Sequence, residues 1–163
     1  GAPAHHFGDA RGLLSEFSAV SFEQLDAAMR AHRARSTEEP FAQFLATGCA
    51  YVEYATRNVA RFQLMFRSDR LDFANERLAA AGSAVFGQLE ETVATLSPGL
   101  DDAARRMRVA AAWSMAHGVA TLSIDNRMFA QLSGNASPPA FMRTLIELFR
   151  PMFAPPPARA RQR

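Results

Sequence analysis

The sequence predicts an all-α fold, and three observations support this. No stretch alternates apolar and polar residues with a period of two, whereas apolar residues recur at spacings of three and four. Residues 109–124, VAAAWSMAHGVATLSI, contain no Asp, Glu, Lys or Arg, so a helix there has to be covered by protein on all sides. The segment is also too short and too polar to cross a bilayer, which needs about 20 apolar residues. In a chain of 163 residues, the simplest cover is a second copy of the chain.

The composition is that of one soluble domain with a sizeable core. Hydrophobic residues make up 48% of the chain, and 18 basic residues against 16 acidic ones give a net charge of +2, which excludes a strong polyelectrolyte field. Cys49 is the one cysteine, so an internal disulfide or a cysteine-based zinc site is excluded. No signal peptide is visible in residues 1–8. We therefore expect a cytoplasmic protein that has no cofactor and no membrane contact.

Two long helices are expected in the first third of the chain. Asp9 can cap a helix that runs to about His32 and spreads its apolar residues over a wide arc, as a central helix does. Residues 36–40, STEEP, form a start signal: a capping hydroxyl, acidic side chains, and a proline where its missing N–H costs nothing. The second helix is expected over 41–57. It would bury Phe41, Leu45, Gly48, Val52 and Ala55.

Three further helices are expected in the middle of the chain. The pattern breaks at Asn58, and a short helix follows over 59–66. Asp72 opens the next helix, which ends at Leu96 with one apolar stripe. The helix that contains the charge-free residues 109–124 is expected over 102–124, and Asp101 and Asp102 at its start are favourable against the helix dipole.

The last helix is expected over 139–153, after a loop at 133–139. It carries two adjacent apolar stripes, which suits one face inside the subunit and one face against a partner. The Pro- and Arg-rich tail at 155–163 is expected to be disordered. The two stripes are Phe141, Leu145, Leu148 and Met152, and Met142, Ile146, Phe149 and Phe153.

Three motifs, in this order along the chain, resemble TetR-like transcriptional regulators. Residues 5–14, HHFGDARGLL, resemble the junction where the recognition helix of a helix-turn-helix ends and the first core helix begins. Residues 51–55 and 62–66 are similar to the Tyr-Ala and Leu-Met-Phe helix pair of one C-terminal class of that family. Residues 113–118 resemble the Trp…His-Gly signature of the same class.

The resemblance implies a DNA-reading head before the first core helix. Such a head needs about 45 residues to place one of its three helices in the major groove. Residues 1–8 would be its remnant, and residues 9–154 would be the ligand-binding and dimerisation domain. In the complete protein, His5 and Arg11 would contact DNA phosphates; the usual phosphate-contacting lysine of the family falls on Ala10 here. The chain as given is not expected to read DNA.

The resemblance also implies an effector cavity among the helices. Trp113 and His117 are four residues apart and share a helix face; they either line this cavity or are packing residues. Phenylalanine and methionine surfaces suit a small hydrophobic or aromatic molecule, although such stripes are more often plain core. The predicted pocket residues are Phe62, Met65, Phe66, Phe86, Trp113 and His117.

A four-helix dimer interface is expected from the helices over 102–124 and 139–153 of each subunit. A glycine in the middle of a helix costs about 1 kcal/mol, and close approach of a partner helix would give Gly118 a packing reason. The predicted interface residues are Gly118, Leu122, Met142, Ile146 and Phe149.

The implied function is that of a repressor domain, in which an effector favours a dimer geometry that no longer fits operator DNA. Two alternatives stay open. One is a structural helical dimer, which a structure with no cavity beyond a few water volumes would favour. The other is a helical-bundle enzyme, but the sequence has no Glu-x-x-His pair, nucleophile motif or glycine-rich phosphate loop. The histidines have no metal-ligand spacing, so we expect no enzyme and no metal.

Overall fold

The computed structural model describes residues 10–153, apart from the side chains at 127 and 128. Every regular element in this range is a helix and none is a strand, which confirms the all-α prediction. The predictions for residues 1–8 and 155–163 lie outside the described residues. The helices are α2 (Ala10–Arg35), α3 (Pro40–Arg57), α4 (Val59–Met65), α5 (Glu76–Leu96), α6 (Asp102–Ile124), α7 (Asn126–Ser133), α8 (Pro138–Leu148) and α9 (Arg150–Phe153).

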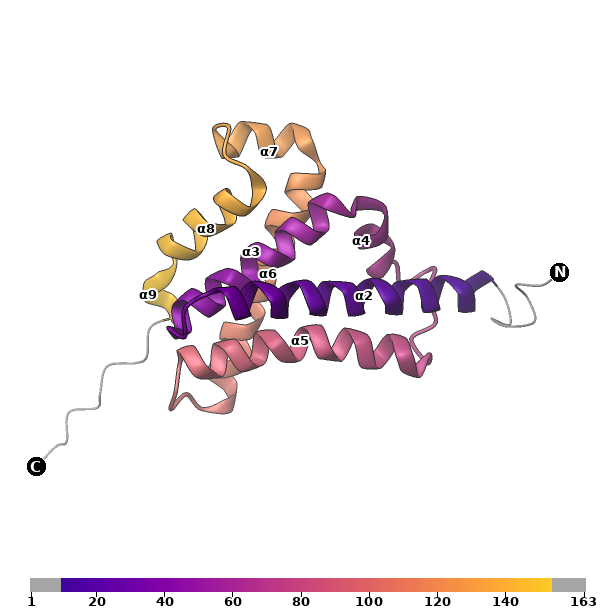
Figure 1. Ribbon diagram of the computed structural model, residues 1–163, viewed down its shortest axis with the longest axis horizontal. Coiled ribbons are helices and arrows are strands. Elements are labelled where there is room, and N and C mark those ends of the chain that lie inside the picture. The colour runs from indigo at the N-terminus through magenta and orange to yellow at the C-terminus, as the bar shows by residue number, and fades with distance from the viewer. Residues whose placement is uncertain (1–9, 154–163) are drawn as a thin grey trace, which may run out of the picture.

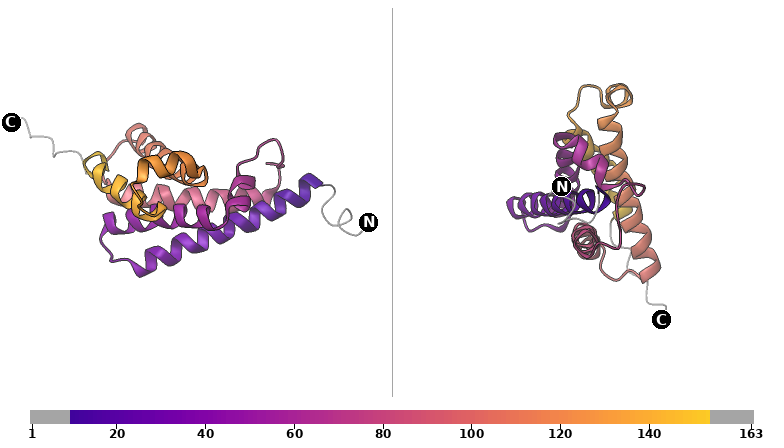
Figure 2. Two further views of the ribbon diagram at one scale, coloured as in Figure 1. Left: turned by 90° about the horizontal axis from the view of Figure 1, so that it is seen from above. Right: turned by 90° about the vertical axis from the view of Figure 1, so that its right-hand side faces the viewer.

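The long helices α2 and α5 lie side by side, and α3 returns across them (Figure 1). Helix α6 runs along one side of the domain, from the end of α5 to α7, as the right-hand view of Figure 2 shows. It packs on α3 and α5, while α8 packs on α3 and α6. One continuous apolar core fills the space between these helices. Its most deeply buried large side chains include Leu25, Val52, Phe62, Met65, Val85, Ile146 and Phe153.

The starts of α3 and α6 follow the predicted signals in part. Pro40 occupies the first turn of α3, as expected, but the capping group is the Glu39 carboxylate, which accepts a 2.7 Å hydrogen bond from the Ala42 N–H. The Ser36 hydroxyl instead donates to the Arg33 carbonyl and so closes the end of α2. At the start of α6 the Asp101 carboxylate accepts from the Ala104 N–H at 2.8 Å.

Helix α5 begins four residues later than Asp72, the predicted start. The Asn75 side chain caps it by accepting a 2.8 Å hydrogen bond from the Leu78 N–H. Asp72 uses its carboxylate within the preceding loop, where it accepts from the Ala74 N–H. Both residue types cap helices well, so composition alone did not decide between them.

The predicted last helix is divided in two, and a further helix precedes it. Helix α8 ends at Leu148, and the four-residue α9 contains Pro151. Proline lacks an N–H and disfavours helical geometry in the residue before it, which explains the break. Helix α7 was not predicted; it ends at Gly134, whose φ of 55° is left-handed.

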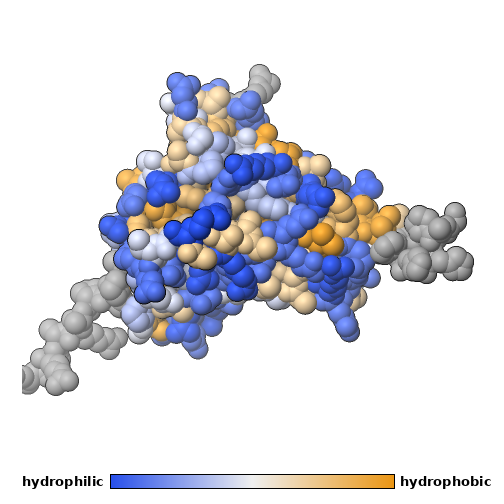
Figure 3. All heavy atoms as spheres, in the orientation of Figure 1, coloured by the Kyte–Doolittle hydropathy of each residue, from blue (hydrophilic) through white to orange (hydrophobic). Residues whose placement is uncertain are grey.

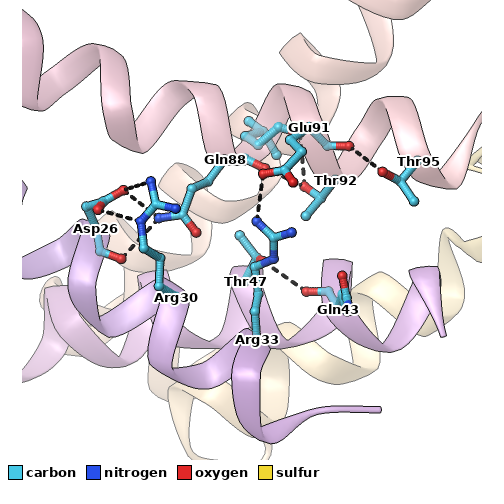
Figure 4. A network of polar contacts seen from close by, with 10 residues as sticks. Asp26, Arg30, Arg33, Gln43, Thr47, Gln88, Glu91, Thr92 and Thr95 are labelled. Carbon is cyan, nitrogen blue, oxygen red and sulfur yellow. Dashed lines mark hydrogen bonds and ion pairs between the residues drawn. The ribbon is translucent and has the colours of Figure 1, made fainter. Parts of the chain in front are cut away.

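A row of polar contacts lines the junction between α2 and α5 (Figure 4). The Gln88 amide group donates to the Asp26 backbone carbonyl at 3.0 Å and to the Asp26 carboxylate at 2.7 Å. Arg30 donates to the same carboxylate, and Arg33 donates to Glu91 at 3.0 Å. These contacts run beside the apolar core and fix the register of the two helices.

Helix α6 is covered on one side only within the described subunit. Its buried residues are Val109, Ala112, Ala116, Val119 and Ala120. On the other side Met107 is 69% exposed, Ser114 and Thr121 are exposed, and a Cβ atom added at Gly118 would meet no described atom within 4 Å. A single subunit therefore leaves one side of α6 uncovered at Met107, Ser114 and Thr121. None of the described helices combines the length and apolar character that a bilayer crossing requires.

Candidate functional site

A hydrogen bond joins the middle of α3 to the middle of α6. The Tyr51 hydroxyl lies 2.9 Å from His117 Nδ1. Tyr51 is 3% exposed, and this burial raises the pKa of its phenol far above the ordinary value. Burial also lowers the pKa of His117, so both side chains are neutral at about pH 7. Which of the two atoms donates depends on the tautomer of the neutral imidazole.

An aromatic cluster surrounds this pair. The Trp113 and His117 rings lie parallel, with planes 8° apart and centroids 5.8 Å apart. The Phe66 ring meets His117 edge-on at 4.6 Å, and the Phe62 ring lies 5.5 Å from His117. Edge-to-face and offset contacts of this kind are the favourable geometries for aromatic rings. The cluster joins α6 to α3 and α4, two consecutive helices that lie far from α6 in the sequence.

Five of the six predicted pocket residues come together here. Phe62, Phe66, Trp113 and His117 form the cluster, and Phe86 joins it from α5 with its ring 5.9 Å from Trp113. The sixth, Met65, is 1% exposed and lines none of the cavities described below.

Tyr51 was not among the predicted pocket residues, although its ring contacts Phe62 and Trp113 at 5.5 and 5.6 Å. The only sequence signal for it is the Tyr-Ala motif at 51–55, because Tyr51 and His117 are 66 positions apart and form no local pattern.

The enclosed space beside the cluster is small. A cavity of about 30 Å³ lies between α3, α5, α6 and α8, with Tyr51 and Trp113 on one wall and Met142 and Ile146 on another. A cavity of this size holds about one water molecule, and an apolar lining gives a water few partners. An effector does not fit into it without movement of the surrounding side chains.

Two larger spaces open to the surface on either side of the Trp113–His117 pair. The first, which we name the α4–α6 groove, has a volume of about 560 Å³. The second, the α5–α6 groove, has a volume of about 410 Å³ and contains Phe86, Trp113 and two arginines at the start of α6. Both volumes lie in the range of small-molecule sites. The α4–α6 groove is lined by Phe62, Gln63, Phe66, Arg67, His117, Thr121, Ile124 and Asp125.

The predicted interface residues divide into two groups. Gly118 and Phe149 are accessible at the surface and Leu122 is half-buried. Met142 and Ile146 are 2% and 0% exposed, because their side chains pack inside the subunit.

Gly48 on α3 explains this packing. A Cβ atom at Gly48 would lie 2.8 Å from Ile146 Cδ1 and 3.0 Å from Met142 Cε, so the absent side chain makes room for both. The prediction that Met142 and Ile146 face a partner is therefore wrong. Of the other stripe, Phe141 and Leu145 are half-buried against the core, whereas Leu148 is 69% exposed and Met152 in the segment after it is 41% exposed.

Arg11, the predicted phosphate contact, is held by the subunit itself. Its Nε donates a 2.9 Å hydrogen bond to the Leu71 carbonyl, which ties the start of α2 to the loop before α5. His5 lies outside the described residues. Within the described range, no group of three His, Cys, Asp or Glu side chains is placed to hold a metal ion.

Comparisons with known proteins agree with this architecture. The family model for the C-terminal domain of tetracyclin repressor-like proteins matches residues 44–149, a range that includes every residue of the aromatic cluster. A solved structure of a protein with unknown function from Rhodococcus sp. RHA1 is similar, with a TM-score of 0.74 and 25% identity over 90% of this chain and 76% of that chain. No curated protein matches.

Proposed function

Because this chain belongs to the tetracyclin repressor-like family through its C-terminal domain, we propose that it is the effector-binding and dimerisation part of a transcriptional repressor. The observation that carries the proposal is the Tyr51–His117 pair, set in an aromatic cluster between two ligand-sized grooves. The effector is a small hydrophobic or aromatic molecule, because flat aromatic surfaces dominate the site. The setting is the cytoplasm, where such a repressor meets DNA.

The open side of α6 supports a homodimer. Met107 on α6 and Leu148 on α8 are each 69% exposed, and a side chain at Gly118 would meet no described atom within 4 Å. A partner helix would bury these positions. Helices α6 and α8 of two subunits would form a four-helix interface. Both grooves border α6, so an effector that moves this helix changes the geometry of the dimer.

The apolar surface at the start of α2 supports the proposal that a DNA-reading head packs there. Apolar atoms gather on this end of the molecule (Figure 3), where Leu13, Phe17 and Val59 are exposed. Arg61 lies over the Phe17 ring at 4.6 Å. In the proposed regulator a head that precedes α2 packs against this surface, and a change in dimer geometry separates the two heads from their half-sites.

A structural dimer without an effector is the second candidate. The observation in its favour is that the cavity between α3, α5, α6 and α8 holds only about 30 Å³. The surface grooves favour the effector function instead, because both are large enough for a ligand and the α4–α6 groove is lined by His117.

Native mass spectrometry of the purified protein tests the proposal. We expect a dimer that carries additional small-molecule mass, and this mass should disappear when the same sample is denatured. Growth of the producing cells with a mixture of aromatic compounds would supply effectors for capture. A ligand-free dimer under all conditions would favour the structural candidate, and a monomer would contradict the interface as well.

A further inference from the structure

The Tyr51–His117 bond determines which nitrogen of the imidazole carries the proton. The described residues offer the Tyr51 hydroxyl no other hydrogen-bond partner than His117 Nδ1. If Nδ1 carried a proton, the buried phenol O–H would have no acceptor, which is costly in the interior. The ring is therefore held as the tautomer with its proton on Nε2.

The Nε2–H group of His117 is available to donate a hydrogen bond to a ligand. No residue in the described part of the chain accepts a hydrogen bond from Nε2. Nε2 is also not one of the fully buried polar atoms without a partner, so it is accessible from outside. His117 also lines the α4–α6 groove. With Nδ1 occupied, Nε2 is the one polar atom that this ring can offer to a molecule in the groove.

The charges around the α4–α6 groove disfavour an anion. Arg67 donates two hydrogen bonds of 2.8 Å to Asp69, and this contact lowers the pKa of the Asp69 carboxyl to about 2. The positive charge of Arg67 is therefore already paired with the Asp69 carboxylate. The other charged side chain of the groove lining is Asp125, which repels a carboxylate.

The remaining lining selects a flat molecule. Phe62 and Phe66 form a wall whose rings lie 5.1 Å apart, and Ile124 adds apolar surface at the end of α6. The Thr121 hydroxyl donates to the His117 carbonyl at 2.7 Å, so its proton is not available to a ligand. Gln63 also lines the groove and carries an amide donor, but its side chain is exposed. His117 is the donor that contacts the aromatic wall directly, through the Phe62 and Phe66 rings.

We propose that the α4–α6 groove binds an uncharged aromatic molecule that bears a carbonyl-type oxygen, and that this oxygen accepts the Nε2 proton of His117. Tyr51 acts as a positioning residue, since it fixes the tautomer without touching the ligand. This inference rests on the proposed effector function and specifies the chemical class of the effector.

Three probes of matched shape test the inference: acetylnaphthalene, which has a neutral acceptor; ethylnaphthalene, which has none; and naphthoate, which is an anion. Trp113 is the one tryptophan in the chain, so its indole N–H gives a single NMR signal beside the site for titration. We expect acetylnaphthalene to bind about fivefold more tightly than ethylnaphthalene, the effect of one net hydrogen bond, and more tightly than naphthoate.

Two variants distinguish the role of His117 as the donor from the role of Tyr51 as the positioning residue. In His117→Phe the preference for acetylnaphthalene should disappear, and in Tyr51→Phe it should fall while long-range nitrogen–proton NMR shows a mixture of imidazole tautomers. His32→Phe replaces a histidine outside the groove and should leave the preference unchanged. Dispersed spectra of each variant verify that it is folded.

The outcomes distinguish this inference from the proposed function. Equal binding of the first two probes, or tightest binding of naphthoate, would overturn the inference and leave an effector site in place. If none of the three probes shifts the Trp113 signal, the effector function at this site is contradicted too. An Nδ1–H tautomer in the unliganded protein would overturn the role of Tyr51.

Discussion

The indole of Trp113 and the imidazole of His117 lie one helical turn apart with their planes 8° from parallel. Each ring borders a different groove, since Trp113 lines the α5–α6 groove and His117 lines the α4–α6 groove. The two grooves are therefore separated by one stacked pair on α6. A ligand that displaces either ring alters the wall of the other groove.

Stability should depend on pH through His117. Burial lowers the pKa of this imidazole in the folded state, so below about pH 6.5 the unfolded chain binds more protons than the folded one. The contribution is present above that pH and is lost as the pH falls through the lowered pKa. We expect the thermal midpoint to decrease from pH 7 to pH 5, roughly the range over which a histidine titrates.

His117→Gln is the matched variant for this effect, because its amide oxygen can accept from Tyr51 but does not titrate. Its thermal midpoint should decrease less over the same range. The groups that face His117 from the groove, Arg67 and Asp125, are unchanged in it. An identical pH profile for both proteins would show that another group is responsible.

Gly118→Leu should break the proposed dimer without unfolding the subunit. A Cβ atom at Gly118 meets no described atom within 4 Å, so the larger side chain conflicts only with a partner helix. Sedimentation velocity should show a monomer with unchanged helical circular dichroism. Gly87→Leu on α5 is the control, because its Cβ position is equally free and lies outside the proposed interface. A Gly118→Leu protein that stays dimeric would place the interface elsewhere.

Ile146→Ala and Leu148→Ala test which stripe of α8 faces inward. Ile146 is 0% exposed and Leu148 is 69% exposed in the subunit. Removal of the buried side chain should lower the free energy of unfolding by about 2–5 kcal/mol, because a cavity remains. Removal of the exposed one should change it by less than about 0.5 kcal/mol.

Chemical denaturation of these two variants on the monomeric Gly118→Leu background keeps dimer contacts out of the comparison. Similar losses for both substitutions would contradict the observed orientation of α8.

Asn75→Ala and Asp72→Ala test where α5 begins. Asn75 caps the helix through the Leu78 N–H and also donates to Glu16 on α2 at 2.8 Å. Its loss should cost about 1 kcal/mol, the usual effect of removing a cap. The Asp72 carboxylate accepts from the Ala74 N–H within the loop, and the bond from the Asp72 backbone N–H to Ser15 survives the substitution, so Asp72→Ala should matter less. The comparison uses urea denaturation, and a larger loss for Asp72→Ala would contradict the cap assignment.

The sequence predicted the helices well where the chemistry is local. Proline in the first turn of α3 and the aspartate before α6 are signals that act within a few residues. The start of α5 was misplaced because Asp72 and Asn75 are both good caps and lie three residues apart. The break after Leu148 was readable from Pro151 but was outweighed by the apolar periodicity of the segment.

The site was predicted only in part, because its central contact joins distant residues. Trp113 and His117 share a helix face, so their stacking follows from a spacing of four. The bond from Tyr51 to His117 depends on how α3 crosses α6, which no local pattern encodes. The inward stripe of α8 depends in the same way on Gly48, whose missing side chain admits Met142 and Ile146.

The open side of α6 also links folding to association. In the proposed dimer, a subunit that leaves Gly118 and Met107 uncovered would gain part of its apolar burial only when a second copy binds, so by mass action the folded dimer would be favoured as the protein becomes more concentrated. Its melting temperature is then a property of the solution as well as of the chain. Dilution alone should bring the protein closer to unfolding.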